Sequence, residues 1–221
     1  MSAGAAQRSS GRSIPVIGIA GGIGSGKSSV ARALGTLGAL VSDSDLQIRA
    51  ALETKDVQET LRSWWGDRAM TSDADVNRSA VAKIVFNDPA ERERLETLLH
   101  PYALRARTTL IERAERERAP CVVIDAPLLF EAGLDGECDA VIFVDAAPET
   151  RLARLRETRG WDQIELIRRE KAQLPLEQKR SNSDHVIINE GEEADLLDSV
   201  RAVLTQIRQD FSDANARPGC S

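Results

Sequence analysis

Short apolar runs, each closed by a small or acidic residue, recur along a chain whose other positions mostly follow helical spacing. Runs of Val, Ile, Leu and Ala between turn residues are typical of buried strands. No hairpin signal joins two consecutive runs, so we expect parallel strands with helical connections. The pattern predicts a three-layer α/β fold, in which helices cover both faces of a five-stranded parallel sheet. The predicted strands are residues 15–20, 39–41, 121–124, 140–144 and 185–188.

Two longer helical stretches interrupt this alternation. Residues from about 50 to 120 carry apolar side chains at helical spacing, and Asp88-Pro89 is a favoured start for a long helix. We expect this stretch to be a helical insertion after the second strand. The predicted division of the chain is a disordered tail at 1–13, one domain at 14–211, and a flexible tail at 212–221. Within the domain, the predicted core is 14–49, 121–148 and 181–211, the insertion is about 50–120, and a second helical segment is about 149–180.

The first predicted strand runs directly into a glycine-rich loop. Residues 21–28, GGIGSGKS, match the phosphate-loop motif G-x-x-x-x-G-K-[ST], with a strand before it and a helix after it. Glycines let the backbone N–H groups approach phosphates closely, and the N-terminus of the helix favours their charge. Lys27 can reach the β- and γ-phosphates, and the Ser28 hydroxyl can bind Mg²⁺. The candidate ATP-binding residues are Gly22, Ile23, Gly24, Ser25, Gly26, Lys27, Ser28 and Ser29.

Two aspartates, Asp43 and Asp45, follow the second predicted strand. Carboxylates at the C-terminal end of a strand lie where active sites form in α/β proteins. A kinase needs a carboxylate that orients the acceptor hydroxyl and takes its proton, and we favour Asp45 for this role. Asp43 or Ser44 can instead cap the following helix, and one residue can cap while the other is catalytic.

Asp125 ends the third predicted strand. This is the expected position of the acidic residue that helps to hold Mg²⁺, directly or through a water molecule. The alternative is that Asp125 caps a helix that begins at Pro127.

Arginines gather in residues 149–180, after the fourth strand. An arginine-lined pair of helices at this place is typical of a mobile lid that closes on phosphates, supplies positive charge and excludes water. The alternative is a solvated helical pair. Helical spacing puts Arg151 and Arg154 on one side. The lid candidates are Arg151, Arg154, Arg159 and Arg169.

Composition narrows the classes of function. The formal net charge is −6 at pH 7, which gives no reason to expect nucleic-acid or membrane-surface binding. Cys121, Cys138 and Cys220 show no metal-binding spacing, so we expect a reduced, cytoplasmic protein. The motifs N-K-x-D and D-x-x-G do not occur in the sequence, which argues against a GTP-dependent switch.

Together these motifs resemble those of the dephospho-coenzyme A kinase family, a family of P-loop kinases. The similarity spans roughly residues 14–205, and the segments occur in the family's order. The matching segments are GGIGSGKSS at 21–29, SDSDLQIR at 42–49, LLHPY at 98–102, DAPLLFE at 125–131, RLARL at 151–155, REKAQ at 169–173 and SDHVIINEG at 183–191.

The resemblance implies transfer of the γ-phosphate of Mg-ATP to the ribose 3′-hydroxyl of dephospho-CoA, the last step of coenzyme A synthesis. It implies a nucleotide-kinase-like fold, with Asp45 as the base, Lys27 and Arg154 as further catalytic residues, and an insertion that holds the CoA moiety. The alternative is a P-loop kinase of another nucleotide or small metabolite, because the fold does not determine the acceptor. A structural role for His100 stays open. The candidate acceptor contacts are Asp43, Arg49, His100, Leu128 and Glu131.

Overall fold

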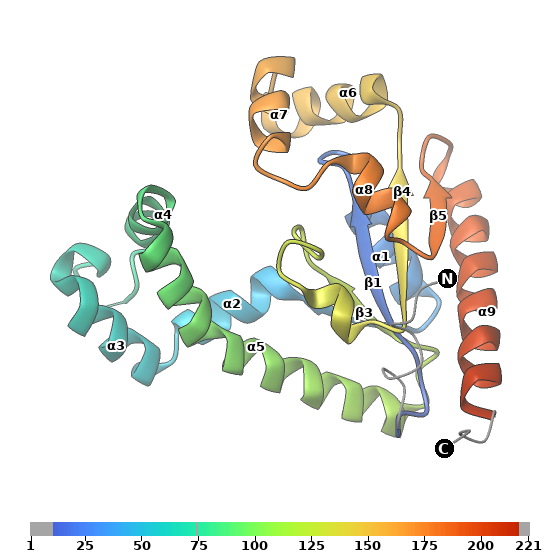
Figure 1. Cartoon of the computed structure of the whole chain (residues 1–221), viewed down its shortest axis with the longest axis horizontal. Coiled ribbons are helices and arrows are strands. Elements are labelled where there is room, and N and C mark those ends of the chain that lie inside the picture. Colours follow the sequence, from blue (N-terminus) through green and yellow to red (C-terminus); the bar gives the residue numbers. More distant parts are fainter. Residues whose placement is uncertain (1–10, 74, 217–221) are drawn as a thin grey trace. The chain divides into compact units, whose positions relative to one another are not determined.

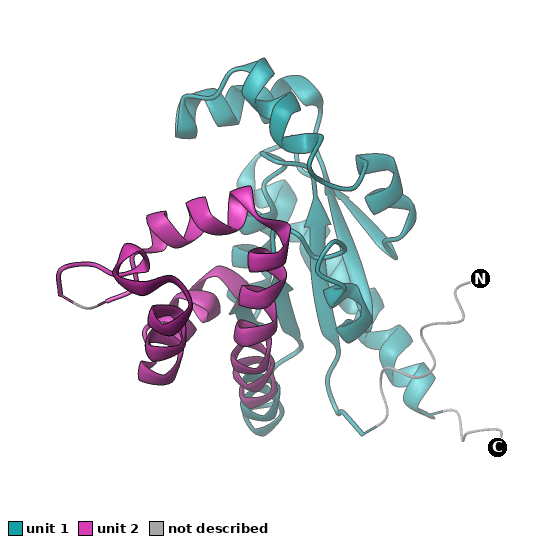
Figure 2. Ribbon diagram, turned by 60° about the vertical axis from the view of Figure 1, so that its left-hand side comes forward, with its two compact units in different colours: residues 1–42, 110–221 teal, residues 43–109 magenta. Residues whose placement is uncertain are grey.

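The computed structural model describes residues 11–73 and 75–216, and the chain divides into two compact units. Unit 1 comprises Met1–Ser42 and Leu110–Ser221, and unit 2 comprises Asp43–Thr109 (Figure 2). Unit 2 therefore begins and ends earlier than the predicted insertion of about residues 50–120, and its first residue, Asp43, is the last residue of the second strand.

Unit 1 is built on a parallel sheet (Figure 1). The strands lie in the order β2-β3-β1-β4-β5, with β1 in the centre. Ile19 pairs with Asp125 on β3, and Gly21 pairs with Val144 on β4, so β1 ends between two parallel neighbours. The prediction of a five-stranded parallel sheet is confirmed. The strands are β1 (Val16–Gly21), β2 (Leu40–Asp43), β3 (Val122–Asp125), β4 (Ala140–Asp145) and β5 (His185–Ile188).

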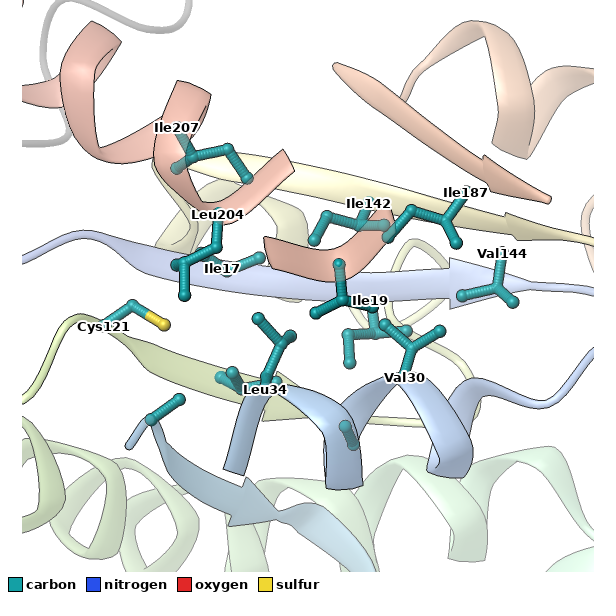
Figure 3. Packing of buried hydrophobic residues seen from close by; sticks show 14 of the residues in the cluster. Ile17, Ile19, Val30, Leu34, Cys121, Ile142, Val144, Ile187, Leu204 and Ile207 are labelled. Atoms are coloured by element: carbon teal, nitrogen blue, oxygen red, sulfur yellow. The ribbon is translucent and has the colours of Figure 1, made fainter. Parts of the chain in front are cut away.

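Apolar side chains alternate between the two faces of β1, and helices cover both faces. Ile17 and Ile19 pack on one face with α1 (Lys27–Thr36) and α9 (Glu193–Ala216), as Figure 3 shows for part of this cluster. Val16 and Ala20 face the other way. They belong to a second cluster with the segment after β3 and with the last part of α5 (Pro89–Glu117). Burial on both faces explains why the strands read as continuous apolar runs.

Unit 2 is helical and has its own hydrophobic core. Trp65 is 4% exposed in this core, and its indole Nε1 donates to Glu91 at 2.9 Å. Trp64 packs against the same cluster, with the Arg94 guanidinium 3.8 Å from its ring centre. Both tryptophans therefore have packing roles. The helices that contribute to unit 2 are α2 (Ser44–Leu52), α3 (Lys55–Trp65), η2 (Gly66–Ala69), α4 (Arg78–Asn87) and residues 89–109 of α5.

Short helices follow β3 and β4. The segment after β3 forms turns over residues 127–133 and then the 3₁₀ helix η3 (Leu134–Glu137), so no helix begins at Pro127 and the capping alternative for Asp125 is wrong. Three helices separate β4 from β5: α6 (Pro148–Arg159), α7 (Gln163–Glu170) and α8 (Leu176–Ser181). We call residues 148–181 the α6–α8 segment.

The ends of the described chain differ from the predicted tails. The last helix, α9, continues to Ala216, so the predicted flexible tail at 212–221 is helical over its first residues. At the other end, Arg12 pairs with Asp139 at 3.0 Å, and the Ser13 N–H donates to Glu115 at 2.8 Å. These contacts tie residues 12 and 13, which were predicted to be disordered, to unit 1; residues 1–10 lie outside the described part.

Two of the three cysteines can be placed. Cys121 and Cys138 are buried thiols in the sheet core, and burial raises the pKa of Cys121 to about 12. Cys220 lies outside the described residues. In the part of the chain that the structure describes, no helix is long and apolar enough to cross a membrane.

Candidate active site

The glycine-rich loop connects β1 to α1 at the C-terminal edge of the sheet. Gly26 precedes α1 with φ +91°, a left-handed conformation that glycine adopts without strain. No side chain among the described residues caps this helix, so its first N–H groups can meet an anion. The Lys27 Nζ donates to the carbonyls of Gly21 and Gly22, both at 3.0 Å, and so lies across the loop.

The loop carbonyls are held by side chains from outside the motif. The Ser25 carbonyl accepts from Asn189 Nδ2 at 2.8 Å and from Arg154 Nη1 at 3.2 Å. The Ile23 carbonyl accepts from Arg151 Nη1 at 3.2 Å. These bonds hold the two carbonyls against the protein and leave the N–H groups at the start of α1 for a phosphate.

Asn189 is a site residue that the sequence reasoning missed. It is 6% exposed, and besides its bond to Ser25 its own carbonyl accepts from Arg154 Nη2 at 2.9 Å. Its position in the sequence could have indicated this role, because Asn189 directly follows β5. The other polar candidates lie at the same place on their strands, since Asp43 ends β2 and Asp125 ends β3. Only the fold brings it against the loop, 164 residues away from Ser25 in the sequence.

The glycines of the loop make room for protein as well as for phosphates. A Cβ on Gly22 would lie 2.6 Å from Arg151 Nη1, and one on Gly26 would lie 2.0 Å from Asn189 Nδ2. The sequence explains these glycines by phosphate approach alone. The structure adds a second reason, which is the close packing of α6 and of the residue after β5 against the loop.

Gly26→Ala is therefore expected to destabilise the chain more than an alanine at another left-handed glycine. We expect a loss of about 3 kcal/mol in the free energy of unfolding, from backbone strain and from the clash with Asn189. Gly133→Ala is the control, because Gly133 also has a positive φ (+67°) but no atom lies within 4 Å of its added Cβ. Its expected cost is about 1 kcal/mol. Urea denaturation measures both, and equal losses would contradict the packing argument.

Lys27 lies in a strongly cationic environment. Burial, followed by the charges of Lys179, Arg151 and Arg159, lowers the pKa of Lys27 to about 8, while Asp125 opposes the shift. This concentration of positive charge beside uncapped N–H groups suits a polyphosphate.

Oxygen ligands for a magnesium ion are present at the same edge of the sheet. Ser28 is exposed on the first turn of α1, and Asp125 ends β3 beside β1. Mg²⁺ in phosphate-transfer sites is commonly held by one or two protein oxygens, with waters and phosphates completing its shell. The described residues contain no group of three His, Cys, Asp or Glu that could form a metal cage. The chemistry of Ser28 and Asp125 therefore fits a magnesium ion that arrives with a nucleotide.

The four arginines predicted for a lid fall into two pairs. Arg151, which is 6% exposed and paired with Glu170, and Arg154 contact the loop backbone. Arg159 and Arg169 lie over the Trp161 ring, at 4.9 and 4.1 Å from its centre. The first pair thus holds the loop, and the second pair joins α6 to α7.

The segment after β3 is tied to the α6–α8 segment. Glu131, predicted as an acceptor contact, accepts from Lys179 Nζ at 2.8 Å and from the Leu174 N–H at 2.9 Å. Leu128, the other acceptor candidate of this segment, is 43% exposed.

The remaining candidates belong to unit 2. The Asp43 carboxylate caps α2 by accepting from the Leu46 N–H at 3.0 Å, so the capping alternative is confirmed for Asp43. Asp45 is exposed on the first turn of the same helix, and Arg49 is exposed four residues later, on the same side. His100 is exposed on α5.

The strand order, the phosphate loop after the central strand and the arginines of α6 define a P-loop kinase fold and its nucleotide-binding half. A family model described as dephospho-CoA kinase matches residues 15–195. The dephospho-CoA kinase of Geobacter metallireducens is 41% identical over 177 residues, 80% of this chain and 88% of that protein. That of Thermus thermophilus is 37% identical over 192 residues, 87% and 91% of the two chains. The chain belongs to the dephospho-CoA kinase family.

Solved structures agree with the fold. The crystal structure of TT1252 from Thermus thermophilus has a TM-score of 0.74 and 37% identity, and the match covers 87% of this chain and 97% of that one. The dephospho-CoA kinase from Campylobacter jejuni has a TM-score of 0.65 at 20% identity and supports the fold alone.

Proposed function

We propose that this protein transfers the γ-phosphate of ATP to the ribose 3′-hydroxyl of dephospho-CoA, giving coenzyme A and ADP in the last step of coenzyme A synthesis. The observation that carries the proposal is the extent of the family match. Residues 15–195 include the phosphate loop of unit 1 and all of unit 2, so donor and acceptor halves belong to the same family.

The donor half is assigned to unit 1. The loop from Gly22 to Ser29 binds the phosphates of ATP through its N–H groups, and Lys27 neutralises the β- and γ-phosphates. Mg²⁺ bound to ATP supplies further charge neutralisation, and Ser28 and Asp125 would hold it, Asp125 directly or through water. Arg154, already fixed to the Ser25 carbonyl, directs positive charge towards the transferring group.

The acceptor half is assigned to unit 2. Asp45 accepts the proton of the 3′-hydroxyl as the oxygen attacks the γ-phosphorus, the bond to the β-phosphate oxygen breaks, and ADP leaves. Asp43 is occupied in capping α2, which leaves the neighbouring carboxylate for the chemistry. Arg49, on the same side of α2 as Asp45, would meet an acceptor phosphate.

Two further parts of the proposal concern closure and location. Residues 149–180 would act as a lid that closes on the nucleotide. Arg151 and Arg154 would hold the lid to the phosphate loop, and Arg159 and Arg169 would join α6 to α7 through the Trp161 ring. The protein would act in the cytoplasm, which agrees with the buried thiols of Cys121 and Cys138.

An ADP-release assay tests the acceptor. The chain is supplied with Mg-ATP and, in parallel, with dephospho-CoA, AMP, CMP, UMP, dTMP and shikimate. We expect turnover with dephospho-CoA to exceed that with every other acceptor. Faster turnover of any other acceptor would support a P-loop kinase of another metabolite and would overturn the proposal.

A further inference from the structure

The most deeply buried charged side chain of the described residues is Lys179 on α8. Its side chain is 2% exposed, and it forms an ion pair with Glu131, whose side chain is 19% exposed. A buried ammonium is costly unless it is paired and hydrogen-bonded, so this position calls for an explanation. We call these residues the Glu131–Lys179 pair.

The pair joins two segments that are far apart in the sequence. Glu131 lies in the turns after β3, the strand that ends at Asp125. Its Oε1 accepts from Lys179 Nζ at 2.8 Å and from the Leu174 N–H at 2.9 Å, in the connection between α7 and α8. Lys179 Nζ also donates to Gln173 Oε1 at 3.0 Å. One carboxylate oxygen therefore joins the C-terminal part of the proposed lid to the turns after β3. This is the strand that ends at Asp125, the proposed magnesium ligand.

The opposite end of the proposed lid is fastened separately. Arg151 bonds to the Ile23 carbonyl and pairs with Glu170, while Arg154 bonds to Ser25. The α6–α8 segment is thus tied to the phosphate loop through α6 and to the segment after β3 through the Glu131–Lys179 pair.

The pair also lies close to the phosphate loop. Figure 1 shows α8 beside β1 and β4, and α8 contacts β1, the strand that leads into the loop. Lys179 is the neighbouring charge that most lowers the pKa of Lys27. Burial alone raises the pKa of Glu131, but the bonds from Lys179 and the Leu174 N–H outweigh it and hold that pKa below its usual value. Glu131 is therefore an ionised anchor at neutral pH.

We propose that Glu131 and Lys179 are positioning residues for phosphoryl transfer, which fasten the connection between α7 and α8, at residues 173–175, to the segment after β3. In this role Glu131 acts through Lys179 and Leu174 and makes no contact with the acceptor. The proposal rests on the proposed function, and it assigns Glu131 a role different from the acceptor contact that the resemblance suggested.

Steady-state kinetics of Glu131→Gln, Lys179→Met and the double variant test this assignment. We expect kcat to fall about tenfold in Glu131→Gln, with the KM for dephospho-CoA changed less than twofold, because the lost interaction positions the lid rather than the acceptor. Residues that act as one unit are non-additive, so the double variant should have a kcat within threefold of either single variant. The double variant also removes the Lys179 charge, which Glu131→Gln leaves buried without its carboxylate partner. The test therefore stays usable if Glu131→Gln folds poorly. Glu157→Gln, an exposed carboxylate of α6, is the matched control and should leave kcat and KM unchanged.

Hydrogen exchange supplies a readout that does not depend on activity. Loss of the charge on Glu131 weakens the bond to the Leu174 N–H, so exchange of that amide should accelerate several-fold in Glu131→Gln and remain unchanged in Glu157→Gln. If dephospho-CoA is not a substrate, the proposed function fails, yet faster exchange at Leu174 with weaker binding of a non-hydrolysable ATP analogue would still support the fastening role.

Three outcomes would overturn the inference. A tenfold rise in the KM for dephospho-CoA at unchanged kcat would make Glu131 an acceptor contact. A lower unfolding temperature of Glu131→Gln with unchanged kcat and KM would show that the pair has only a structural role. Additive losses in the double variant would show that the two residues do not act together.

Discussion

Asp45→Asn is expected to lower kcat about 100-fold or more while ATP binding stays unchanged. Asparagine keeps the size of the side chain but cannot take the proton of the acceptor hydroxyl. Asp45 is exposed on the first turn of α2, and Asp43 caps that helix, so the folded state should tolerate the change. Single-turnover kinetics and titration with a non-hydrolysable ATP analogue measure the two effects separately.

Asp43→Asn is the matched control for this experiment. Asparagine caps helices about as well as aspartate, so the bond to the Leu46 N–H is retained and the free energy of unfolding should change by less than about 1 kcal/mol. We expect kcat to stay within a few-fold of the unaltered chain. If Asp43→Asn loses kcat and Asp45→Asn does not, the assignment of the base is wrong.

Lys27→Met is expected to lower kcat about 100- to 1000-fold, because it removes a fixed positive charge beside the transferring phosphate. Methionine fills a similar volume and retains the apolar stem. Lys83→Met, at an exposed position on α4 of unit 2, removes the same charge outside the phosphate loop and the proposed lid and should leave kcat unchanged. Equal kcat for Lys27→Met and the unaltered chain would contradict the role of Lys27.

The buried amine of Lys27 also makes the stability of the unaltered chain depend on pH, and Lys27→Met lacks this dependence. The pKa of Lys27 is about 8 in the folded chain and near 10.5 in the unfolded chain, so the unfolded chain binds more protons between these values. The cost of the charged amine is fully present below pH 8 and disappears as the pH rises towards 10.5. Relative to Lys27→Met, the unaltered chain should therefore gain stability over this interval, as urea denaturation at pH 7.5 and 10 would measure.

The local sequence determined the elements and the chemistry carried on a single stretch. The five strands follow from short apolar runs, and the phosphate loop from glycines at set spacing between a strand and a helix. These features depend on neighbouring residues alone, so they can be read along the chain. The role of Asp43 stayed open because a capping and a catalytic aspartate have the same sequence appearance, and only the bond to Leu46 separates them.

Tertiary structure decided which distant side chains complete the nucleotide half of the site. Asn189, Arg151 and Arg154 hold the loop carbonyls because parallel strands bring β1 and β5 to one edge of the sheet and α6 against it. The buried Glu131–Lys179 pair likewise joins residues 48 positions apart, and nothing in the sequence identifies the two residues as partners. The sequence alone therefore identified the phosphate-binding loop, whereas packing determined what holds that loop and the proposed lid in place, because burial and partner choice depend on the whole fold.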